Sequence, residues 1–440
     1  MPQRRATLVR WRVCALMTIG SFVAYLLRSN MSVAGVPMAA DLGLTRIELG
    51  LVLGGFAWGY ALFQFPGGVV GDLIGARRAL AAIAVLWGVF NLLVGLIPAR
   101  AAGGAVTVIL VLVALRFLMG AAQAPLFPII GGGTTCSWFP ASGWALPNAL
   151  QNAGATFGAA ATGPLIAWLA GRFGWRASFL ITAPAALVFA AGWWWYVRDR
   201  PAQHRGVNAA ERELIDRGRP AAQALPIERG GWKAVLRDPQ VRLLTVGYFC
   251  ANFVFYFFFN WLFTYLIESR GFQLLEGGWY AAVPWMAGAV GAVAGGWVCD
   301  RLWARIGPRR SCSIPGAAGL LAAGALLLAA AEAPHPIVAV ALLSLCLGAQ
   351  QFTDAIYWAG MIAVAGRRAS AGCGVMNTGG NLAGGVVALL VPLAVDRLGW
   401  PAALATASAF AFAAAALWLV TAVDRAMDGA AEPRVAEAVA

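Results

Sequence analysis

A short charged motif occurs twice in this chain, and the distance between its copies constrains the fold. The first copy, GVVGDLIGARR, begins at Gly68, and the second, GWVCDRLWARIGPRR, begins at Gly296. Their aspartates, Asp72 and Asp300, are 300 − 72 = 228 residues apart. A second pair of segments, GRFGWRASF and DRLGWPAAL, gives an offset of 399 − 174 = 225 between their glycines. Because two unrelated pairs of segments have nearly the same offset, we infer that one half of the chain is a duplicate of the other. Many membrane transporters are built in this way, with a site between the two halves.

The composition assigns most of the chain to a lipid bilayer. Of its 440 residues, 60% are hydrophobic and only 12% are charged, a balance that the surface of a water-soluble protein of this size would not tolerate. Backbone polar groups in hydrocarbon need partners within their own segment, and the apolar runs lack the alternation of barrel strands. We therefore predict an all-α polytopic membrane protein. The expected spans are 13–37, 48–71, 79–98, 105–130, 145–170, 176–197, 241–267, 277–300, 312–331, 337–364, 371–395 and 401–423.

The positive charge follows the membrane topology. The formal net charge is +13, and arginines concentrate at the N-terminus and in every second loop. The central loop, from Arg198 to Arg242, is the richest, whereas the alternate loops are sparse. By the positive-inside rule, both termini and the central loop are cytoplasmic. Because no basic domain stands apart from the spans, we expect no nucleic-acid partner.

The spans divide the chain into four parts. These are an N-terminal six-helix bundle (1–197), a cytoplasmic linker (198–240), a C-terminal six-helix bundle (241–424) and a cytoplasmic tail (425–440). A short amphipathic helix is expected in the linker at about 208–217, where it would act as a tether. The seven cysteines lie in or beside apolar spans without paired spacing, and both histidines lie in loops. We therefore expect no disulfide framework, metal site or cofactor.

Several segments resemble a known family. They are YLLRSNMSVAGVPMAADLGLT (25–45), FAWGYALFQFPGG (56–68), FVFYFFFNWLFTYLIESRGF (253–272), AAVPWMAGAVG (281–291) and VMNTGGNLAGG (375–385). Together with the repeated aspartate loop and Arg116 in RFLMG, they resemble the major facilitator superfamily. The match is closest to its anion:cation symporter branch of organic-anion transporters. The resemblance implies twelve helices in two pseudo-symmetric bundles and transport by alternating access, rather than enzymatic catalysis.

The repeated motif is interpreted as a gate. An aspartate at the end of a helix can accept hydrogen bonds from the N-terminus of another helix and pair with a basic side chain across an interface. The resemblance implies a latch that holds the cytoplasmic face closed, without touching substrate. Leu73 and Ala76 replace residues that are usually basic in the family, so the first latch is expected to be weaker than is typical of the family. The predicted gate residues are Asp72, Gly75, Arg77, Asp300 and Arg301.

Two arginines lie near the middle of predicted spans. Arg28 and Arg116 would be costly there unless each faces a polar cavity or a partner. Excluding helix ends, the core holds one carboxylate, Asp354, so one positive charge is left over and an anion is its natural occupant. The resemblance assigns binding of the substrate carboxylate to Arg28. The alternative is that one arginine, Arg116 more readily than Arg28, neutralises a structural carboxylate.

Two positions depart from the family pattern. Proton-coupled members commonly carry Asp just before the helix 1 arginine and Glu in helix 4, where this chain has Leu27 and Gln123. The usual coupling route is therefore absent, although Gln123 is two helical turns from Arg116 and is still expected to line the cavity. Asp354 is then the candidate proton carrier. A fixed salt bridge from Asp354 to Arg28 or Arg116 is the alternative.

Neutral polar side chains within the spans complete the candidate pocket. Asn377 and Asn381 are four residues apart and share a helix face. Such side chains can bind hydroxyls or a second carboxylate, or can merely join helices. The glycine-rich stretches 131–133 and 379–385 are interpreted as packing surfaces rather than phosphate cradles. Besides Arg28, Arg116 and Gln123, the predicted substrate-binding residues are Tyr25, Tyr60, Gln64, Gln151, Asn152, Tyr256, Asn260, Asn377 and Asn381.

These observations predict a secondary active transporter of a small organic anion in the inner membrane. A sugar acid, a dicarboxylate and an aromatic acid are the candidate substrates. We expect a monomer whose partners are the anion, H⁺ or Na⁺ as coupling ion, and the bilayer. A membrane-embedded enzyme would need a nucleophile with its base or a metal cluster, and the sequence indicates neither. An uncoupled facilitator, an anion exchanger and a transport-deficient substrate sensor stay as alternatives.

Overall fold

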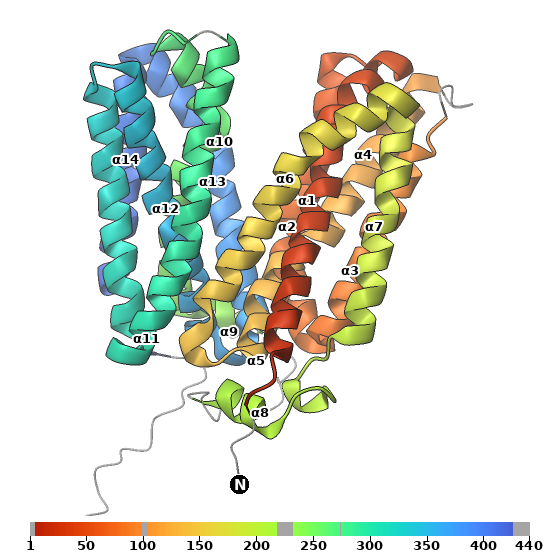
Figure 1. Cartoon of the computed structure of the whole chain (residues 1–440). Helices are drawn as coiled ribbons and strands as arrows, with labels where there is room; N and C mark the ends of the chain where they lie inside the picture. The colour runs from red at the N-terminus through yellow and green to blue at the C-terminus, as the bar shows by residue number, and fades with distance from the viewer. Residues whose placement is uncertain (1–4, 99–103, 218–231, 273, 426–440) are drawn as a thin grey trace, which may run out of the picture.

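The protein folds into two helical bundles that lie side by side (Figure 1). The structure, a computed structural model, describes residues 5–98, 104–217, 232–272 and 274–425, and no strand occurs in these ranges. The first bundle contains α1 (Val9–Leu42), α2 (Arg46–Ile74), α3 (Ala76–Gly95), α4 (Gly104–Gln123), α6 (Ala145–Phe173) and α7 (Trp175–Tyr196). The second contains α10 (Pro239–Glu268), α11 (Leu274–Glu332), α12 (Pro336–Ala365), α13 (Ala369–Leu398) and α14 (Trp400–Val420). The predicted all-α class is confirmed.

The described helices provide enough apolar length for twelve crossings. Ten helical stretches are long and apolar enough to span a membrane, and two of these, Tyr280–Glu332 and Pro336–Leu398, contain 53 and 63 residues. Each of the two can cross twice, because about 20 residues suffice for one crossing. The first is broken inside α11 at Gly307, whose φ is 79°. The second is broken at Gly366, whose φ is 55°, between α12 and α13.

Local sequence signals set several helix starts. Thr45 and Glu48 form a capping box at the start of α2, where the Thr45 hydroxyl accepts from the Glu48 amide and the Glu48 carboxylate accepts from the Thr45 amide. Asp238 caps α10, accepting from the amides of Gln240 and Val241 at 2.8 and 3.0 Å. Both caps satisfy amides that have no partner within their helix.

The sequence repeat is also a repeat of backbone conformation. Gly75 and Gly307 follow the two gate aspartates and have φ values of 85° and 79°. Gly174 and Gly399 join the last two helices of each half, with φ values of 84° and 79°. Residues with a side chain rarely adopt this left-handed region, so both sharp helix-to-helix turns depend on glycine.

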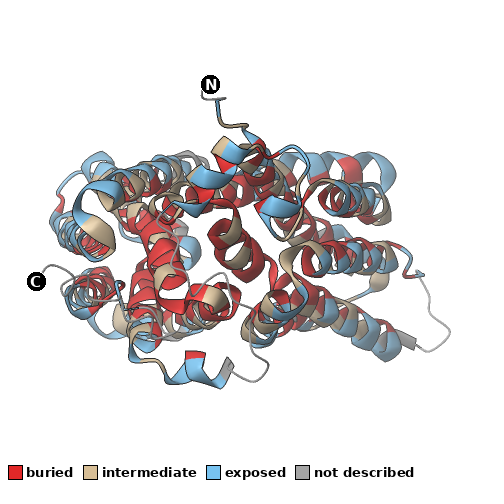
Figure 2. Cartoon of the chain, turned by 90° about the horizontal axis from the view of Figure 1, so that it is seen from below, coloured by how far each residue is buried: buried red, intermediate tan, exposed pale blue. Residues whose placement is uncertain are grey.

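The two bundles pack most closely towards one end, and we call this the linker end because α7 ends and α10 begins there. Glycines allow the closest approaches: a Cβ on Gly68 would lie 2.4 Å from the Ser370 carbonyl oxygen, and one on Gly132 would lie 2.7 Å from that of Ala369. Gly132 belongs to a short π-helical segment, Pro128–Thr134, that follows α4. Buried residues gather where the bundles meet at this end (Figure 2). At the opposite end, which we call the outer end, the bundles separate (Figure 1).

The linker is docked on the first bundle. Its helix α8 (Ala209–Asp216) begins at Asn208, whose side chain accepts from the Glu211 amide, and it matches the amphipathic helix predicted here. Residues 218–231 of the linker and 426–440 of the predicted tail lie outside the described residues. Glu211 is fully buried and accepts from the backbone amides of Val9 and Arg10 at 3.2 and 3.1 Å. The Arg10 guanidinium adds an ion pair of 3.1 Å, so a linker carboxylate caps the first helix of the chain.

Candidate functional site

The two repeated aspartates join the bundles at the linker end. The Asp72 carboxylate, at the end of α2, accepts from the amides of Ser370 and Ala371 at 3.2 and 2.9 Å. The Asp300 carboxylate, in α11, accepts from the amides of Ala145 and Leu146 at 2.9 and 3.0 Å. Each aspartate therefore caps the first turn of a helix in the other bundle, α13 for Asp72 and α6 for Asp300. These are the hydrogen bonds expected of a pair of symmetric latches.

Within the residues that the structure describes, no hydrogen bond or ion pair joins the motif arginines Arg77 and Arg301 to the other bundle. The Arg77 side chain donates to the Trp194 carbonyl at 2.9 Å and stacks on the Trp194 ring, while its amide donates to Asp199 at 2.8 Å. All of these partners belong to the first half of the chain. Arg301 packs over the Trp297 ring of its own helix, at 4.9 Å. In this conformation Arg77 and Arg301 contact residues of their own half, and the two aspartates join the bundles by capping backbone amides.

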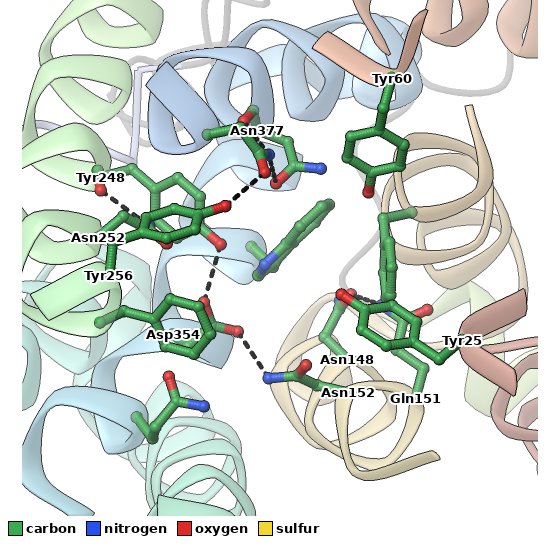
Figure 3. A pocket seen from close by; sticks show the side chains of 15 residues that line it. Tyr25, Tyr60, Asn148, Gln151, Asn152, Tyr248, Asn252, Tyr256, Asp354 and Asn377 are labelled. Atoms are coloured by element: carbon green, nitrogen blue, oxygen red, sulfur yellow. Dashed lines mark hydrogen bonds between the residues drawn. The ribbon is translucent and has the colours of Figure 1, made fainter. Parts of the chain in front are cut away.

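A polar pocket lies between the bundles, with side chains of both halves around it (Figure 3). The space between its walls is about 600 Å³, part of which is open to solvent. The first bundle contributes side chains from α1, α2 and α6, and the second from α10, α12 and α13, so both halves face the enclosed space. The lining residues are Tyr25, Tyr60, Phe127, Asn148, Gln151, Asn152, Tyr248, Asn252, Phe255, Tyr256, Gln351, Asp354, Trp358, Asn377 and Asn381.

Asp354 connects the two walls of the pocket. Its carboxylate accepts from the Tyr248 hydroxyl at 2.8 Å, within the second bundle, and from the Asn152 amide of α6 at 3.3 Å, across the interface (Figure 3). No ion pair joins Asp354 to Arg28 or Arg116 in the described part of the chain, so the expected alternative of a fixed salt bridge is absent from this conformation. Farther along the same wall, the Tyr256 hydroxyl donates to Asn381 at 2.7 Å.

Arg28 and Arg116 share one aromatic ring beside the pocket. Their guanidinium carbons lie 4.9 and 4.8 Å from the centre of the Phe56 ring. Arg28 also packs against the rings of Tyr60 and Tyr25, at 4.8 and 5.3 Å, and both of these tyrosines line the pocket. Arg116 is 3% exposed, and no carboxylate of the described residues pairs with either arginine. The site therefore holds two positive charges and no paired acid in its first half.

Glycines bring Arg116 to this ring. A Cβ on Gly59 of α2 would lie 2.0 Å from the Phe117 carbonyl oxygen, and one on Gly120 of α4 would lie 2.2 Å from that of Phe56. The two helices therefore pack backbone to backbone at the depth of Phe56, and Arg116 reaches the ring from α4.

Comparisons with known proteins assign the chain to a family. The family model described as "Major Facilitator Superfamily" matches residues 17–349. The chain belongs to the major facilitator superfamily. It is 31% identical over 408 residues to "Probable sulfoacetate transporter SauU" of Cupriavidus necator, covering 91% of this chain and 90% of that protein. It is 30% identical over 412 residues to "Probable galactarate/D-glucarate transporter GudP" of Bacillus subtilis, covering 90% and 88%.

Solved structures of the superfamily share the fold. The transporter FucP in the outward conformation superposes with a TM-score of 0.71 at 17% identity, covering 93% of this chain and 99% of that one. The proton:xylose symporter XylE gives a TM-score of 0.70 at 15% identity, covering 94% and 96%. The predicted major facilitator fold is confirmed. Since the superfamily consists of transporters, the alternative of a membrane-embedded enzyme is excluded.

Within this major facilitator fold, five predicted binding residues are not part of the pocket lining. Arg28 and Arg116 lie beside the pocket, as described above, and Gln64, Gln123 and Asn260 lie elsewhere. Gln123 is buried and donates to the Ala24 carbonyl at 2.8 Å, so it joins α4 to α1. Gln64 of α2 is buried, and its backbone carbonyl oxygen lies next to Gly374 of α13. Asn260 is exposed one helical turn beyond Tyr256, towards the outer end. Periodicity identifies which residues share a helix face, but it does not say whether that face meets a cavity or another helix.

The repeat explains the position of Gln123. In the second half, Gln350 of α12 donates to the Ala251 carbonyl of α10 at 3.3 Å. The offsets are 350 − 123 = 227 for the glutamines and 251 − 24 = 227 for their acceptors. A glutamine at this position therefore joins the first and fourth helices of each half, and this role is independent of substrate.

The pocket also contains residues that the sequence analysis missed. Helical spacing from predicted residues could have identified most of them. Asn148 is three residues before Gln151, and Gln351 and Trp358 are three before and four after Asp354. The missed lining residues are Phe127, Asn148, Tyr248, Asn252, Phe255, Gln351 and Trp358.

Proposed function

We propose that this protein is a secondary transporter of a small organic anion, in which Arg28 binds the carboxylate and Asp354 carries a coupling proton. The observation that supports the anion most strongly is the pair of arginines on Phe56, because two guanidinium groups without a paired carboxylate attract an anionic ligand. The curated relatives support the same class, since their names include transporters of sulfoacetate, galactarate and D-glucarate.

Amide and hydroxyl groups of the pocket favour a polyhydroxylated acid over an aromatic one. Asn152, Asn252 and Asn377 each present a side-chain amide to the pocket. Tyr25 and Tyr60, whose rings pack against Arg28, each present a hydroxyl. Such a set can donate to and accept from several hydroxyls of one ligand. A sugar acid is therefore the substrate class that the pocket chemistry fits best.

The orientation follows from charge. The arginine-rich loops and the docked linker lie at the linker end, so the positive-inside rule assigns this end to the cytoplasm. The conformation described above is then outward-facing, with its gate closed towards the cytoplasm. Transport requires the Asp72 and Asp300 caps to break while the outer end closes, and we expect this to occur in a monomer in the inner membrane.

Ligand binding by Arg28 variants tests the proposal. Purified full-length protein is screened by thermal shift against sugar acids, dicarboxylates and aromatic acids, because a ligand of the folded state raises the melting temperature. Arg28→Ala should weaken binding of the best acid about 10- to 100-fold, since a hydrogen-bonded charge contributes about 1.5–3 kcal/mol. Arg28→Lys should recover part of it, and Arg78→Ala, which removes an exposed arginine at the linker end, should bind normally. Unchanged affinity in Arg28→Ala, or stabilisation only by neutral or cationic compounds, would refute the anion site.

A further inference from the structure

A basic groove lies on the outside of the molecule at the linker end. It is an open surface groove, lined by Leu146 of α6 and by Trp297, Asp300, Arg301, Ala304 and Arg305 of α11. Trp297, Arg301 and Arg305 follow one another at intervals of four residues and therefore share one face of the helix. The groove is separate from the pocket between the bundles, although Asp300, which caps α6 at the closed linker end, forms part of its wall.

The two arginines of the groove are not paired with an acid among the described residues. Within the described ranges, no hydrogen bond or ion pair involves Arg305, and Arg301 contacts only the Trp297 ring, at 4.9 Å. Asp300 is close in sequence, but its two oxygens accept from the amides of Ala145 and Leu146. Like charges four residues apart on a helix repel each other, so an anion held between the guanidinium groups would stabilise this face.

An apolar track continues from the groove along the same face of α11 towards the outer end. Met286, Val290 and Val293 precede Trp297 at intervals of four, three and four residues, and they are 70%, 71% and 36% exposed. Trp297 itself is 51% exposed. A tryptophan between an apolar stripe and a pair of arginines is the arrangement found at the boundary of a membrane, where hydrocarbon meets phosphate.

We propose that this groove binds the headgroup of an anionic phospholipid. The phosphate oxygens lie between Arg301 and Arg305, and an acyl chain follows Met286, Val290 and Val293. A free phosphate ester would share the polar contacts but would leave the apolar track uncovered, so the track favours the lipid. Because the groove contains Leu146 of the first half and α11 of the second, the bound lipid contacts both halves only while the linker end is closed. It therefore stabilises the closed linker end by differential binding.

Lipid titration of the purified full-length carrier in detergent tests this site. Dioleoylphosphatidylglycerol should raise the melting temperature more than dioleoylphosphatidylcholine, and native mass spectrometry should detect more bound phosphatidylglycerol. Arg301→Gln/Arg305→Gln should weaken phosphatidylglycerol binding about tenfold or more, because each arginine near a headgroup contributes on the order of 1 kcal/mol. Arg305→Gln alone gives a second measurement if the double variant is poorly folded, since Arg305 has no described polar partner in the protein.

The controls separate this site from general charge and from soluble anions. Arg309→Gln/Arg310→Gln removes the same charge from exposed residues outside the groove, and it should bind phosphatidylglycerol like the wild type. Glycerol 3-phosphate and inorganic phosphate should not reproduce the stabilisation at equal concentration. Equal binding of the two lipids, an equal loss in the control variant, or full stabilisation by either soluble phosphate would overturn the proposal. None of these measurements depends on which anion is transported.

Discussion

At the residue scale, the arrangement of Arg28, Phe56 and Arg116 determines what the pocket can hold. Each guanidinium gains a cation–π contact of about 0.5–2 kcal/mol with the ring, which offsets part of the cost of burying the charge. The contact does not remove the repulsion between the two cations. An arriving carboxylate is therefore attracted by both charges, although the more buried Arg116 acts at longer range. Arg28 also packs on two pocket tyrosines, and it is the arginine that we propose contacts the ligand.

Asp354 is predicted to couple transport to protons. It is the only acid among the described pocket residues. Leu27, which stands where proton-coupled relatives commonly have Asp, has no side-chain proton to exchange. Asp354→Asn keeps the shape of the side chain. In proteoliposomes, this variant should still exchange labelled substrate across the membrane, but it should no longer accumulate substrate in response to a pH gradient. Because exchange needs no net proton movement, the two assays separate coupling from binding.

The matched control for this variant is Gln351→Asn, which shortens a neutral side chain on the same wall one helical turn away. It should leave pH-driven accumulation in place. Loss of exchange together with accumulation in Asp354→Asn, in a protein that still folds, would instead indicate that the Asn152 and Tyr248 hydrogen bonds of Asp354 have a structural role.

The pocket could be predicted from the sequence only in part, and for identifiable reasons. Polar residues in the middle of apolar spans are costly, so Tyr25, Asn152 and Asp354 stood out and do line the pocket. Gln123 stood out equally but satisfies a backbone carbonyl of a neighbouring helix. The hydrogen bond between Asn152 and Asp354 crosses the interface and depends on how the two halves meet, which local sequence does not encode.

At the element scale, α8 is a cap rather than a loose tether. Its Glu211 supplies acceptors for the amides of Val9 and Arg10 and for the Thr7 hydroxyl, at 3.2, 3.1 and 2.6 Å. These are groups at the start of α1 that the helix itself cannot satisfy. The charge of Glu211 also lies at the positive end of the α1 dipole. The amphipathic pattern predicted the helix, but its partner lies about 200 residues away in sequence and could not be predicted from it.

Removing Glu211 should release the linker from the first bundle. Glu211→Ala leaves a partly buried guanidinium and two amides without their acceptor, which we expect to cost about 2–4 kcal/mol of docking free energy. Limited trypsin digestion should then cleave faster at the linker arginines, with cleavage sites identified by mass spectrometry. Glu213→Ala is the matched control on the same helix, since Glu213 is exposed and pairs only with exposed Arg217, at 3.7 Å. Equal cleavage rates in the two variants would contradict the capping role.

At the scale of the whole molecule, the duplication provides two equivalent aspartate caps at the linker end, and we call each of them a lock. Asp72 acts from the first half on α13, and Asp300 acts from the second half on α6. The sequence offset predicted that the motifs are related, and backbone conformation and capping show the same relation in space. Both locks hold in this conformation, so its closed end is stabilised twice by the same interaction.

Loss of either lock should shift the carrier away from this conformation. An N-terminal cap contributes about 1 kcal/mol, and the charge adds to it, so Asp72→Ala or Asp300→Ala should each change the ratio of the two states roughly tenfold. Spin labels on cysteines introduced at Phe173 and Leu398 report the separation of the halves. Both residues are exposed, at the outer ends of α6 and α13. Because all seven native cysteines are buried, the introduced ones should label selectively.

The distance distribution measured by double electron–electron resonance should gain a shorter component in both variants, since opening of the linker end closes the outer end. Asp199→Ala is the matched control: Asp199 also accepts from a helix-start amide, that of Arg77 at 2.8 Å, but within the first half. It should lower the melting temperature without changing the distances. If the distances in Asp72→Ala and Asp300→Ala match those of the wild type, the two aspartates stabilise helix ends and do not set the conformational equilibrium. A shift in one variant alone would mean that the locks, although equivalent in geometry, are unequal in strength.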